Sequence, residues 1–286
     1  MDTRALLSLV TVADTASFSR AAARLGFTQS AVSQHVAGLE RSAGTLLLTR
    51  RPAVVPTPAG LEYLRHARAI LAHEQAAHAA VARATGRDAE APVTVAVTPA
   101  AEHLVAAAGP LAAVLVLDTT DAASALESGR ADLAVVDGVA APGDPLPGSS
   151  PDVAVRLVRE SPVAVLLPAD HPLSGRPGLD LTSLTEARWL DTSRVACSTA
   201  ELASVARLAL RRGTAYTGTT PAVVASLVRA GHGLAGAPLT AAVPDGLALV
   251  PVVAPRLVYR VEVRIHSTAR AAVRLAADGV REAAGP

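Results

Sequence analysis

The chain has 286 residues and contains no lysine, so arginine supplies all 26 of its basic side chains. Its single cysteine, Cys197, cannot form an internal disulfide, which fits a reducing compartment such as the cytoplasm. Aromatic residues make up 2% of the chain, which argues against a stacking pocket for a flat cofactor. No apolar run reaches the roughly 20 residues of a membrane-spanning helix. We therefore expect a cytoplasmic protein without a membrane segment or a cofactor.

Enzyme motifs are also missing. The sequence has no Gly-x-Ser-x-Gly elbow, no phosphate-binding loop and no cysteine pair. His66, His73 and His78 are separated by seven and five residues, which does not place a tight metal-binding pair on one helix face. We predict no catalytic residue and no metal site, and we expect Cys197 to be a buried, inert thiol rather than a redox switch.

Charge is distributed unevenly along the chain. Residues 1–90 carry 10 arginines and 7 acidic residues (net +3), and residues 91–286 carry 16 and 18 (net −2), which together give the overall charge of +1. The segment 17–68 holds 7 arginines and only 2 acidic residues. This local excess of positive charge suits a segment that meets phosphates.

Capping signals in this basic segment predict two helices joined by a tight turn. Ser19 can cap a short helix that ends at Gly26, because glycine readily takes the left-handed conformation. Thr28 can cap a second helix, and Phe27 before it can pack on Val32 as a hydrophobic staple. Two capped helices separated by one glycine are typical of a helix-turn-helix.

The second helix has two unlike faces. Val32, Val36 and Leu39 share a narrow apolar arc, with Gln29 at its edge. Serine and glutamine side chains can bond base edges and phosphates, and small residues let the backbone approach a groove. An ordinary amphipathic surface helix would show the same period, and the neighbouring elements are what favour a DNA-binding helix. The opposite face carries Ser30, Ser33, Gln34, Ala37, Gly38 and Arg41.

A hairpin, or wing, is expected after this helix. The segments 46–50 and 54–57 read as its strands, with Arg51 and Pro52 at the turn. Arg50 and Arg51 at the tip are placed to touch a phosphate backbone, although two solvated arginines on an exposed loop are the alternative. Thr57 and Pro58 form the N-cap and first-turn pair of the next helix.

These pieces together resemble the DNA-binding domain of LysR-type transcriptional regulators, over residues 1–60. The resemblance implies a winged helix-turn-helix that contacts an inverted repeat in double-stranded DNA. It departs from the family at Leu48, where phenylalanine is usual. The matching positions are Ser17–Ala22, Leu25, Gln29–Gln34, Leu39, Glu40, Gly44, Arg50 and Thr57–Gly60. The DNA-binding residues that we predict are Ser19, Thr28, Gln29, Ser30, Ser33, Gln34, Arg41, Arg50 and Arg51.

One long helix is expected from Pro58 to about Arg83, where only Gly60 interrupts an alanine-rich sequence. Leu61, Leu64 and Leu71 fit a heptad-like spacing, so the helix needs a partner to cover its apolar stripe. In the LysR family this element is an antiparallel dimerisation helix, which implies a homodimer or homotetramer. Packing on the chain's own C-terminal part is the alternative.

The chain beyond a polar hinge at 85–92 alternates short apolar strands with helices. This pattern predicts a mostly parallel sheet with both faces covered, arranged as two subdomains with a cleft between them. Strands are expected at 93–97, 114–117, 132–136, 153–158, 163–167 and 257–266. Helices are expected after Thr98 and at 121–128, 202–211, 222–229 and 269–284.

By the same resemblance this part is an effector domain, similar to periplasmic binding proteins. The predicted domains are a winged helix-turn-helix at 1–58, a linker helix at 59–86 and an α/β effector domain at 92–286. Within the last, subdomain I covers about 92–160 and 238–286, and subdomain II about 161–237. The span from the first strand to Asp132 is shorter than in the family, so a clipped first helix and an altered or absent pocket are expected.

Ligands in open α/β sheets bind at the carboxyl ends of strands, where helix N-termini present free amides. Each candidate could equally serve only as an N-cap of its own helix. We predict a small polar metabolite, such as a carboxylate, as the effector. A regulator without a ligand that acts by DNA occupancy, and a solute-binding module, are the alternatives. The predicted ligand-binding residues are Thr98, Ala100, Thr192, Ser193, Thr219 and Thr220.

Overall fold

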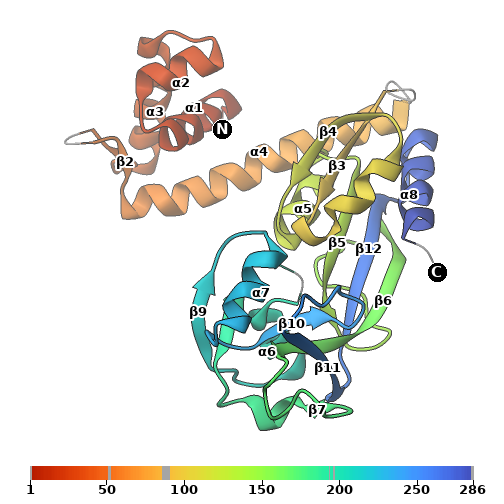
Figure 1. The fold of residues 1–286 in the computed structure, drawn as a ribbon. Coiled ribbons are helices and arrows are strands. Elements are labelled where there is room, and N and C mark those ends of the chain that lie inside the picture. Colours follow the sequence, from red (N-terminus) through yellow and green to blue (C-terminus); the bar gives the residue numbers. More distant parts are fainter. Residues whose placement is uncertain (1, 51–52, 86–90, 193, 196, 285–286) are drawn as a thin grey trace. The chain divides into compact units, whose positions relative to one another are not determined.

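The structure, a computed structural model, describes residues 2–50, 53–85, 91–192, 194–195 and 197–284. It divides into two compact units, Met1–Val81 and Ala82–Pro286 (Figure 1). Among the described residues, no helix combines the length and the apolarity that crossing a membrane requires.

The N-terminal unit is built from helices with a small hairpin. Its elements are α1 (Thr3–Thr15), α2 (Phe18–Leu25), α3 (Gln29–Ala43), β1 (Leu48–Thr49), β2 (Val55–Pro56) and α4 (Pro58–Thr85). The first three helices pack on one another around a core in which Leu6, Leu9 and Val36 are fully buried. Leu64 and Ala67 of α4 join the same core, so the start of the long helix is part of this unit.

The helix caps confirm most of the local predictions and correct one. The Thr28 hydroxyl accepts a hydrogen bond of 3.2 Å from the Ala31 amide, and Gly26 ends α2 in the left-handed region with φ +68°. The cap of α2 is Ser17, whose side chain accepts from the Arg20 amide, so the prediction of Ser19 as the cap was wrong. Ser17 has the extended backbone of an N-cap residue directly before α2, whereas Ser19 lies inside the first turn of the helix.

The hairpin pairs Leu48 with Pro56 and Thr49 with Val55. Its predicted tip, Arg51 and Pro52, lies outside the described residues. Thr57 caps α4 by accepting from the Gly60 amide at 2.9 Å, as predicted. A Cβ atom on Gly60 would lie 1.9 Å from the carbonyl oxygen of Leu47, the residue before β1, so this close approach of α4 to the backbone tolerates only glycine.

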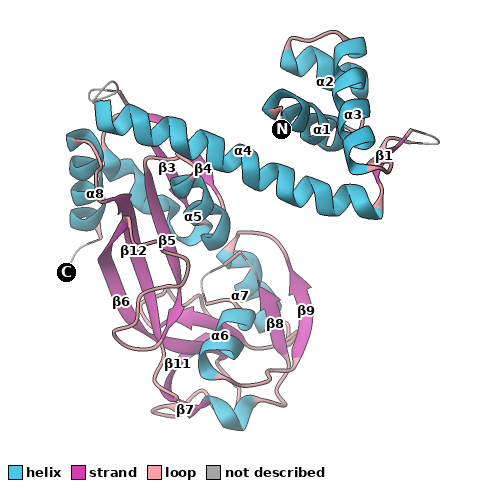
Figure 2. Cartoon of the chain, turned by 180° about the vertical axis from the view of Figure 1, so that it is seen from behind, coloured by secondary structure: helices cyan, strands magenta, loops and turns pink. Residues whose placement is uncertain are grey.

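The C-terminal unit is centred on an eight-stranded sheet (Figure 2). Its strand order is β4-β3-β5-β12-β6-β11-β7, with β10 also paired to β6. The strands are β3 (Val93–Val97), β4 (Leu111–Val116), β5 (Leu133–Ala140), β6 (Val153–Pro168), β7 (Leu179–Asp180), β10 (Ala235–Pro238), β11 (Leu247–Ala254) and β12 (Val258–His266). A second, two-stranded sheet contains β8 (Trp189–Thr192) and β9 (Arg212–Tyr216).

The prediction of a mostly parallel sheet was wrong. β4, β3 and β5 run parallel, but β12 is antiparallel to both β5 and β6, and β10 and β11 are antiparallel to β6. The two strands predicted at 153–158 and 163–167 are one continuous strand, β6. Its first part pairs with β12 and its last part with β10 and β11, so a single strand runs through both halves of the unit.

Helices cover both faces of the sheet where β3 and β5 lie. Alternate residues of β3 point to opposite sides, so Val95 and Val97 contribute to one core and Ala96 to another. The first core is covered by η1, a 3₁₀ helix at Pro99–Ala108, and by α8 (Ala271–Ala283), and the second by α5 (Thr119–Glu127). The helix predicted after Thr98 is therefore a 3₁₀ helix.

The second half carries α6 (Thr199–Ala206), α7 (Pro221–Arg229) and a short 3₁₀ helix, η2 (Leu181–Leu184). α6 begins three residues earlier than predicted and ends at Ala206; its C-cap, Arg207, adopts the left-handed conformation with φ +55°. Trp189, the only tryptophan, is fully buried, and its indole nitrogen donates to the Leu184 carbonyl at 3.0 Å.

Candidate functional site

The outer face of α3 presents the polar side chains that the sequence singled out. Gln29, Ser30, Gln34 and Arg41 are exposed and Ser33 is half-buried, whereas the opposite side of the helix is fully packed. The Thr28 and Ser30 hydroxyls lie 3.0 Å apart, which orders the start of this face. The helix therefore offers free donors and acceptors along one side, as a groove-binding helix requires.

Arg50 directly follows β1 and contacts one residue of α2 and one of α3. Its guanidinium carbon is 5.1 Å from the centre of the Phe18 ring, and Nη2 is 3.8 Å from Oε2 of Glu40. Half of the arginine side chain remains exposed. These contacts orient the guanidinium, and its exposed part stays available to a phosphate.

Glu40 has a second contact that the sequence did not reveal. Its Oε1 atom accepts hydrogen bonds from the Leu47 and Leu48 amides, at 3.0 Å and 3.2 Å. The carboxylate is nearly buried, so it joins the end of α3 to the start of the hairpin. The available signals were its place among the positions that match the LysR family and its position next to the hydrophobic run that begins the wing.

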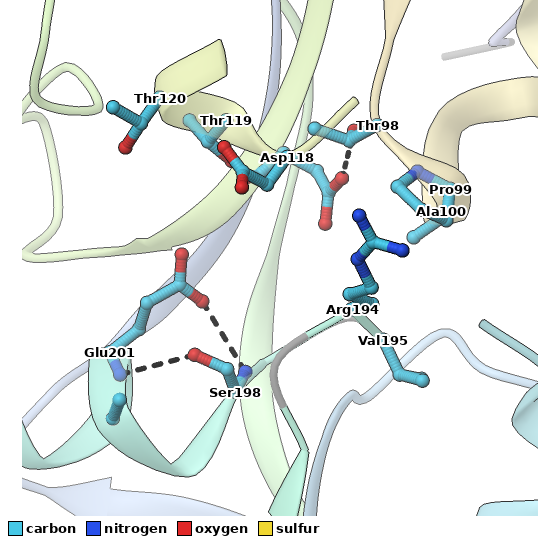
Figure 3. A pocket seen from close by; sticks show the side chains of 12 residues that line it. Thr98, Pro99, Ala100, Asp118, Thr119, Thr120, Arg194, Val195, Ser198 and Glu201 are labelled. Atoms are coloured by element: carbon cyan, nitrogen blue, oxygen red, sulfur yellow. Dashed lines mark hydrogen bonds between the residues drawn. The ribbon is translucent and has the colours of Figure 1, made fainter. Parts of the chain in front are cut away.

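The C-terminal unit contains a cavity of about 270 Å³, which we call the first cavity. Its walls come from the start of η1, the start of α5, the middle of β5 and the segment that leads into α6. In Figure 3 the Arg194 guanidinium points toward the Thr98–Ala100 segment, and the Glu201 carboxylate points toward Thr119. Polar groups from four separate segments thus face one space.

Asp137 is the most buried charged group in the first cavity. It accepts hydrogen bonds from the Thr98 hydroxyl and, at 2.9 Å, from the Tyr259 hydroxyl. Burial raises the pKa of Asp137, although these two hydrogen bonds oppose the shift, and burial also raises the pKa of Tyr259. The Thr98 side chain therefore serves Asp137 and does not cap η1.

Glu201 supplies a second carboxylate from α6. It forms a reciprocal capping box with Ser198: the Glu201 amide donates to the Ser198 hydroxyl at 3.2 Å, and the Ser198 amide donates to the glutamate at 3.3 Å. Burial raises the pKa of Glu201 to about 7, with a further contribution from the charge of Asp137. The first cavity thus combines two carboxyl groups whose pKa values are raised with the exposed side chain of Arg194.

Two family models match the chain over most of its length. Residues 3–61 match the bacterial regulatory helix-turn-helix protein, lysR family, and residues 107–285 match the LysR substrate binding domain. The second match alone covers more than half of the chain. The chain belongs to the LysR family.

Individual LysR relatives agree with this assignment. The chain is 31% identical to the HTH-type transcriptional regulator ShiR of Corynebacterium glutamicum, over 69% of this chain and 68% of that protein. It is 34% identical to a small neutral protease regulatory protein of Streptomyces coelicolor, over 66% of this chain and 59% of that protein. These matches span about three fifths to two thirds of each relative's own length. LysR proteins are transcriptional regulators and not enzymes.

Solved structures show the same fold. A full-length OxyR variant from Pseudomonas aeruginosa superposes with a TM-score of 0.58 at 23% identity, covering 98% of this chain and 95% of that one. The LysR family regulator CbnR superposes with a TM-score of 0.56 at 19% identity, covering 100% of both chains. The order of a helix-turn-helix unit and an α/β unit is therefore that of LysR regulators.

The predicted ligand-binding residues of this LysR regulator do not all line the same cavity in the structure. Thr98 and Ala100 line the first cavity. Thr219 lines a second cavity, which Ala100 also borders. Thr192 is buried at the end of β8 and lines neither cavity, and Ser193 lies outside the described residues. Thr220 is the N-cap residue before α7, but its side chain makes no capping hydrogen bond.

Sequence reasoning missed the charged residues of the first cavity. Asp137 lies inside an apolar strand and Glu201 in the first turn of α6, so each reads as an ordinary strand or cap residue. A single polar residue within a hydrophobic strand was the available signal for Asp137. Arg194 has no local signal, because the η1 residues that line the cavity with it are far away in the sequence.

Proposed function

We propose that a small polar metabolite binds in the first cavity and controls this LysR regulator. The observation that carries the proposal is the convergence of Asp137, Glu201 and Arg194 on one cavity of about 270 Å³. A ligand with hydrogen-bond donors would face the two carboxyl groups, and an acceptor or a carboxylate on it would face Arg194. Such a ligand contacts both halves of the unit and would favour one arrangement of them.

The DNA contacts follow from the exposed face of α3. We infer that Gln29, Ser30, Ser33 and Gln34 lie in the major groove and contact base edges and phosphates. Thr28 caps the start of α3, Arg41 lies in its last turn and Arg50 directly follows β1, and we infer that all three contact the phosphate backbone. Ser19 on α2 is exposed and completes the proposed interface, together with Arg51, whose placement is not described.

We propose a homodimer, or a homotetramer, assembled through α4. Ile70 and Ala77 are one heptad apart and exposed, while Leu64 and Ala67 are buried in the N-terminal core. The exposed pair therefore remains for a partner helix. Two subunits would present two recognition helices to an inverted repeat.

The proposed division of the chain is a winged helix-turn-helix at 1–58, a linker helix at 59–86 and an effector domain at 92–286. The two halves of the effector domain would be 92–160 with 238–286, and 161–237. Because a regulator must reach the chromosome, we place its action in the cytoplasm.

A thermal-shift screen of the purified full chain with amino acids, hydroxy acids and amines tests the effector proposal. A metabolite that binds only the folded state raises the free energy of unfolding by RT ln(1 + [L]/Kd), and it therefore raises the unfolding temperature. We expect at least one such metabolite, and we expect Arg194→Gln and Glu201→Gln to abolish its shift. Arg176→Gln is the matched control, because Arg176 is exposed and lines neither cavity.

The same metabolite should change the affinity of the chain for genomic DNA fragments. A shift that persists in both cavity variants would contradict the proposed site. If no compound of the screen shifts the unfolding temperature while DNA binding is intact, the chain acts by DNA occupancy and the effector proposal fails.

A further inference from the structure

The long helix α4 extends well beyond its contact with the core of the N-terminal unit. It has 28 residues, which span roughly 40 Å at 1.5 Å per residue. Among the described residues, the α4 side chains that pack on this core lie between Tyr63 and Leu71, with Leu64 and Ala67 buried in it. The exposed sides of the helix are therefore the surface on which the proposed contact between subunits has to form.

A stripe of exposed residues runs along α4 at alternating spacings of four and three. At 100° per residue its members fall within an arc of about 80°, and the buried Leu64 and Ala67 lie outside this arc. This is the spacing with which two helices pack against each other along their length. We call the stripe the seam, and its members are His66, Ile70, His73, Ala77 and Ala80.

The two histidines are the titratable members of an otherwise apolar seam. In a symmetric pair a surface meets its own copy, so His66 and His73 would face Ile70, Ala77 and Ala80 of the second copy. A neutral imidazole fits such a contact, whereas an imidazolium brings an unpaired charge into it at a cost. Histidine is the side chain that ordinarily changes its charge between pH 5 and 8.

The hydrogen bond of His66 already requires the neutral ring. Nη2 of Arg65 lies 2.8 Å from Nε2 of His66 and 3.1 Å from Oε2 of Glu62. A guanidinium only donates hydrogen bonds, so the imidazole nitrogen has to accept one. Protonation of this nitrogen would break the bond and place two positive charges side by side.

Other charged groups near α4 are paired or lie away from the centre of the seam. Glu62, one turn before His66, is bound by Arg65. Asp14 of α1 pairs with Arg68 at 2.7 Å, on a side of α4 that is turned by about 160° from the centre of the seam. Glu74, which follows His73, is turned by about 80° from that centre. The same groups of the second copy would approach the seam from its two edges.

We propose that the seam makes assembly through α4 dependent on pH: two copies associate while His66 and His73 are neutral, and acidification separates them. This inference rests on the proposed contact between α4 helices and names how that contact is regulated. A fall in pH then acts against DNA binding, because a separated subunit brings one recognition helix to an inverted repeat instead of two.

Sedimentation equilibrium of the full chain at about pH 8 and pH 6, at equal ionic strength, tests the proposal. Circular dichroism at both pH values serves as the control for folding. Ile70→Glu identifies the association step that runs through the seam, because a charge at this position should abolish that step at both pH values. In the wild type, the dissociation constant of the same step should rise by about ten-fold or more from pH 8 to pH 6.

Histidine variants show which side chains carry the response. His66→Gln combined with His73→Gln keeps polar side chains that do not titrate, so the change in the dissociation constant should stay below about three-fold. His78→Gln is the matched control, because His78 is exposed on α4 but turned by about 120° from the centre of the seam. This control should keep the wild-type response.

The outcomes separate the pH inference from the proposed assembly. If Ile70→Glu removes an association step whose wild-type dissociation constant is equal at both pH values, the pH inference alone is overturned. It is also overturned if the double histidine variant keeps the wild-type response, or if association tightens in acid, as pairing of protonated histidines with Glu62 or Glu74 would produce. If Ile70→Glu removes no association step, the inference and the proposed assembly through α4 both fail.

Discussion

The Oε1 atom of Glu40 accepts a hydrogen bond of 3.0 Å from the backbone amide of Leu47. The same oxygen accepts from the next amide, that of Leu48, at 3.2 Å. One carboxylate at the end of α3 therefore fixes where the hairpin begins. The position of the wing relative to the recognition helix depends on this contact.

Replacement of Glu40 by alanine should loosen the wing. The substitution leaves two nearly buried amides without an acceptor, and each such amide costs about 1–3 kcal/mol. Hydrogen exchange of the full chain should show faster exchange in a peptide that covers Leu47 and Leu48. Glu62→Ala is the control, because Glu62 forms an exposed pair with Arg65. Equal exchange in wild type and Glu40→Ala would contradict the role of this carboxylate.

Gly60→Ala should destabilise the N-terminal unit. The added Cβ would lie 1.9 Å from the Leu47 carbonyl oxygen, which is backbone and cannot move without disturbing the hairpin. Gly38→Ala provides the comparison, since its nearest neighbour would be the Arg41 side chain at 4.0 Å. Thermal unfolding followed by circular dichroism should show a lower first transition for Gly60→Ala only. A wild-type transition in Gly60→Ala would show that α4 does not cross the hairpin this closely.

Gln34→Ala and Arg50→Ala should affect DNA binding in different ways. Gln34 is exposed on the groove-facing side of α3, so its loss should cost about 1–3 kcal/mol on specific sites and relax the sequence preference. Arg50 offers a charge, so its loss should weaken binding to all sequences and lower the salt slope by about 1. Mobility-shift titrations at several salt concentrations separate these effects. Equal losses on selected and random DNA for both variants would refute the division of roles.

The stability of the C-terminal unit should fall as the pH rises toward 7. Glu201 has a pKa of about 7 in the folded chain, against an ordinary value of 4.5, so the folded state binds its proton more tightly. Its contribution is therefore fully present below pH 4.5 and is lost as the pH rises through 7. The raised pKa of Asp137 acts in the same direction. Urea unfolding at about pH 5 to 8 should show a smaller pH dependence for Glu201→Gln, and an unchanged dependence would contradict the assignment.

Cys197 should be unreactive in the folded protein. It is fully buried, and burial, with a contribution from the charge of Glu201, raises its pKa well above the ordinary value for a thiol. Ellman's reagent at about pH 8 should therefore react slowly with the native chain and rapidly in urea. Rapid reaction in both conditions would show that the thiol is accessible and that a redox role has to be considered.

Local chemistry was enough to predict the N-terminal unit. The caps at Thr28 and Thr57, the left-handed Gly26 and the buried stripe of α3 all arise from residues close together in sequence. The error at Ser19 is a shift of two residues between neighbouring serines, either of which can cap. Helix ends are decided by backbone geometry that the residue types leave open.

The sheet of the C-terminal unit was less predictable, because its strand directions are set by long-range pairing. The stretch 257–266 was predicted as a strand, but nothing in its sequence indicates which of its charged residues are buried. Glu262 and Arg264 are fully buried and paired with each other at 3.0 Å. Arg264 also donates to the Leu146 carbonyl at 2.8 Å, 118 residues away. No local pattern contains this contact.

The candidate cavities could be predicted only in part, because most of their residues come together through long-range contacts. Thr98 and Ala100 follow a strand and precede a helical turn, which is a recognisable position. Asp137 and Arg194 are brought together only when segments that are distant in the sequence meet around the first cavity. Their side-chain types are ordinary in sequence, and their burial and partners are not encoded locally.

The central claim is that the polar face of α3 reads DNA sequence. Its most direct test is to incubate the purified full chain with fragmented genomic DNA from its source and to sequence the retained fragments. We predict enrichment of an inverted repeat by the wild type and loss of that enrichment in Gln34→Ala. Retention of fragments without any shared sequence, or an identical repeat selected by Gln34→Ala, would contradict the claim.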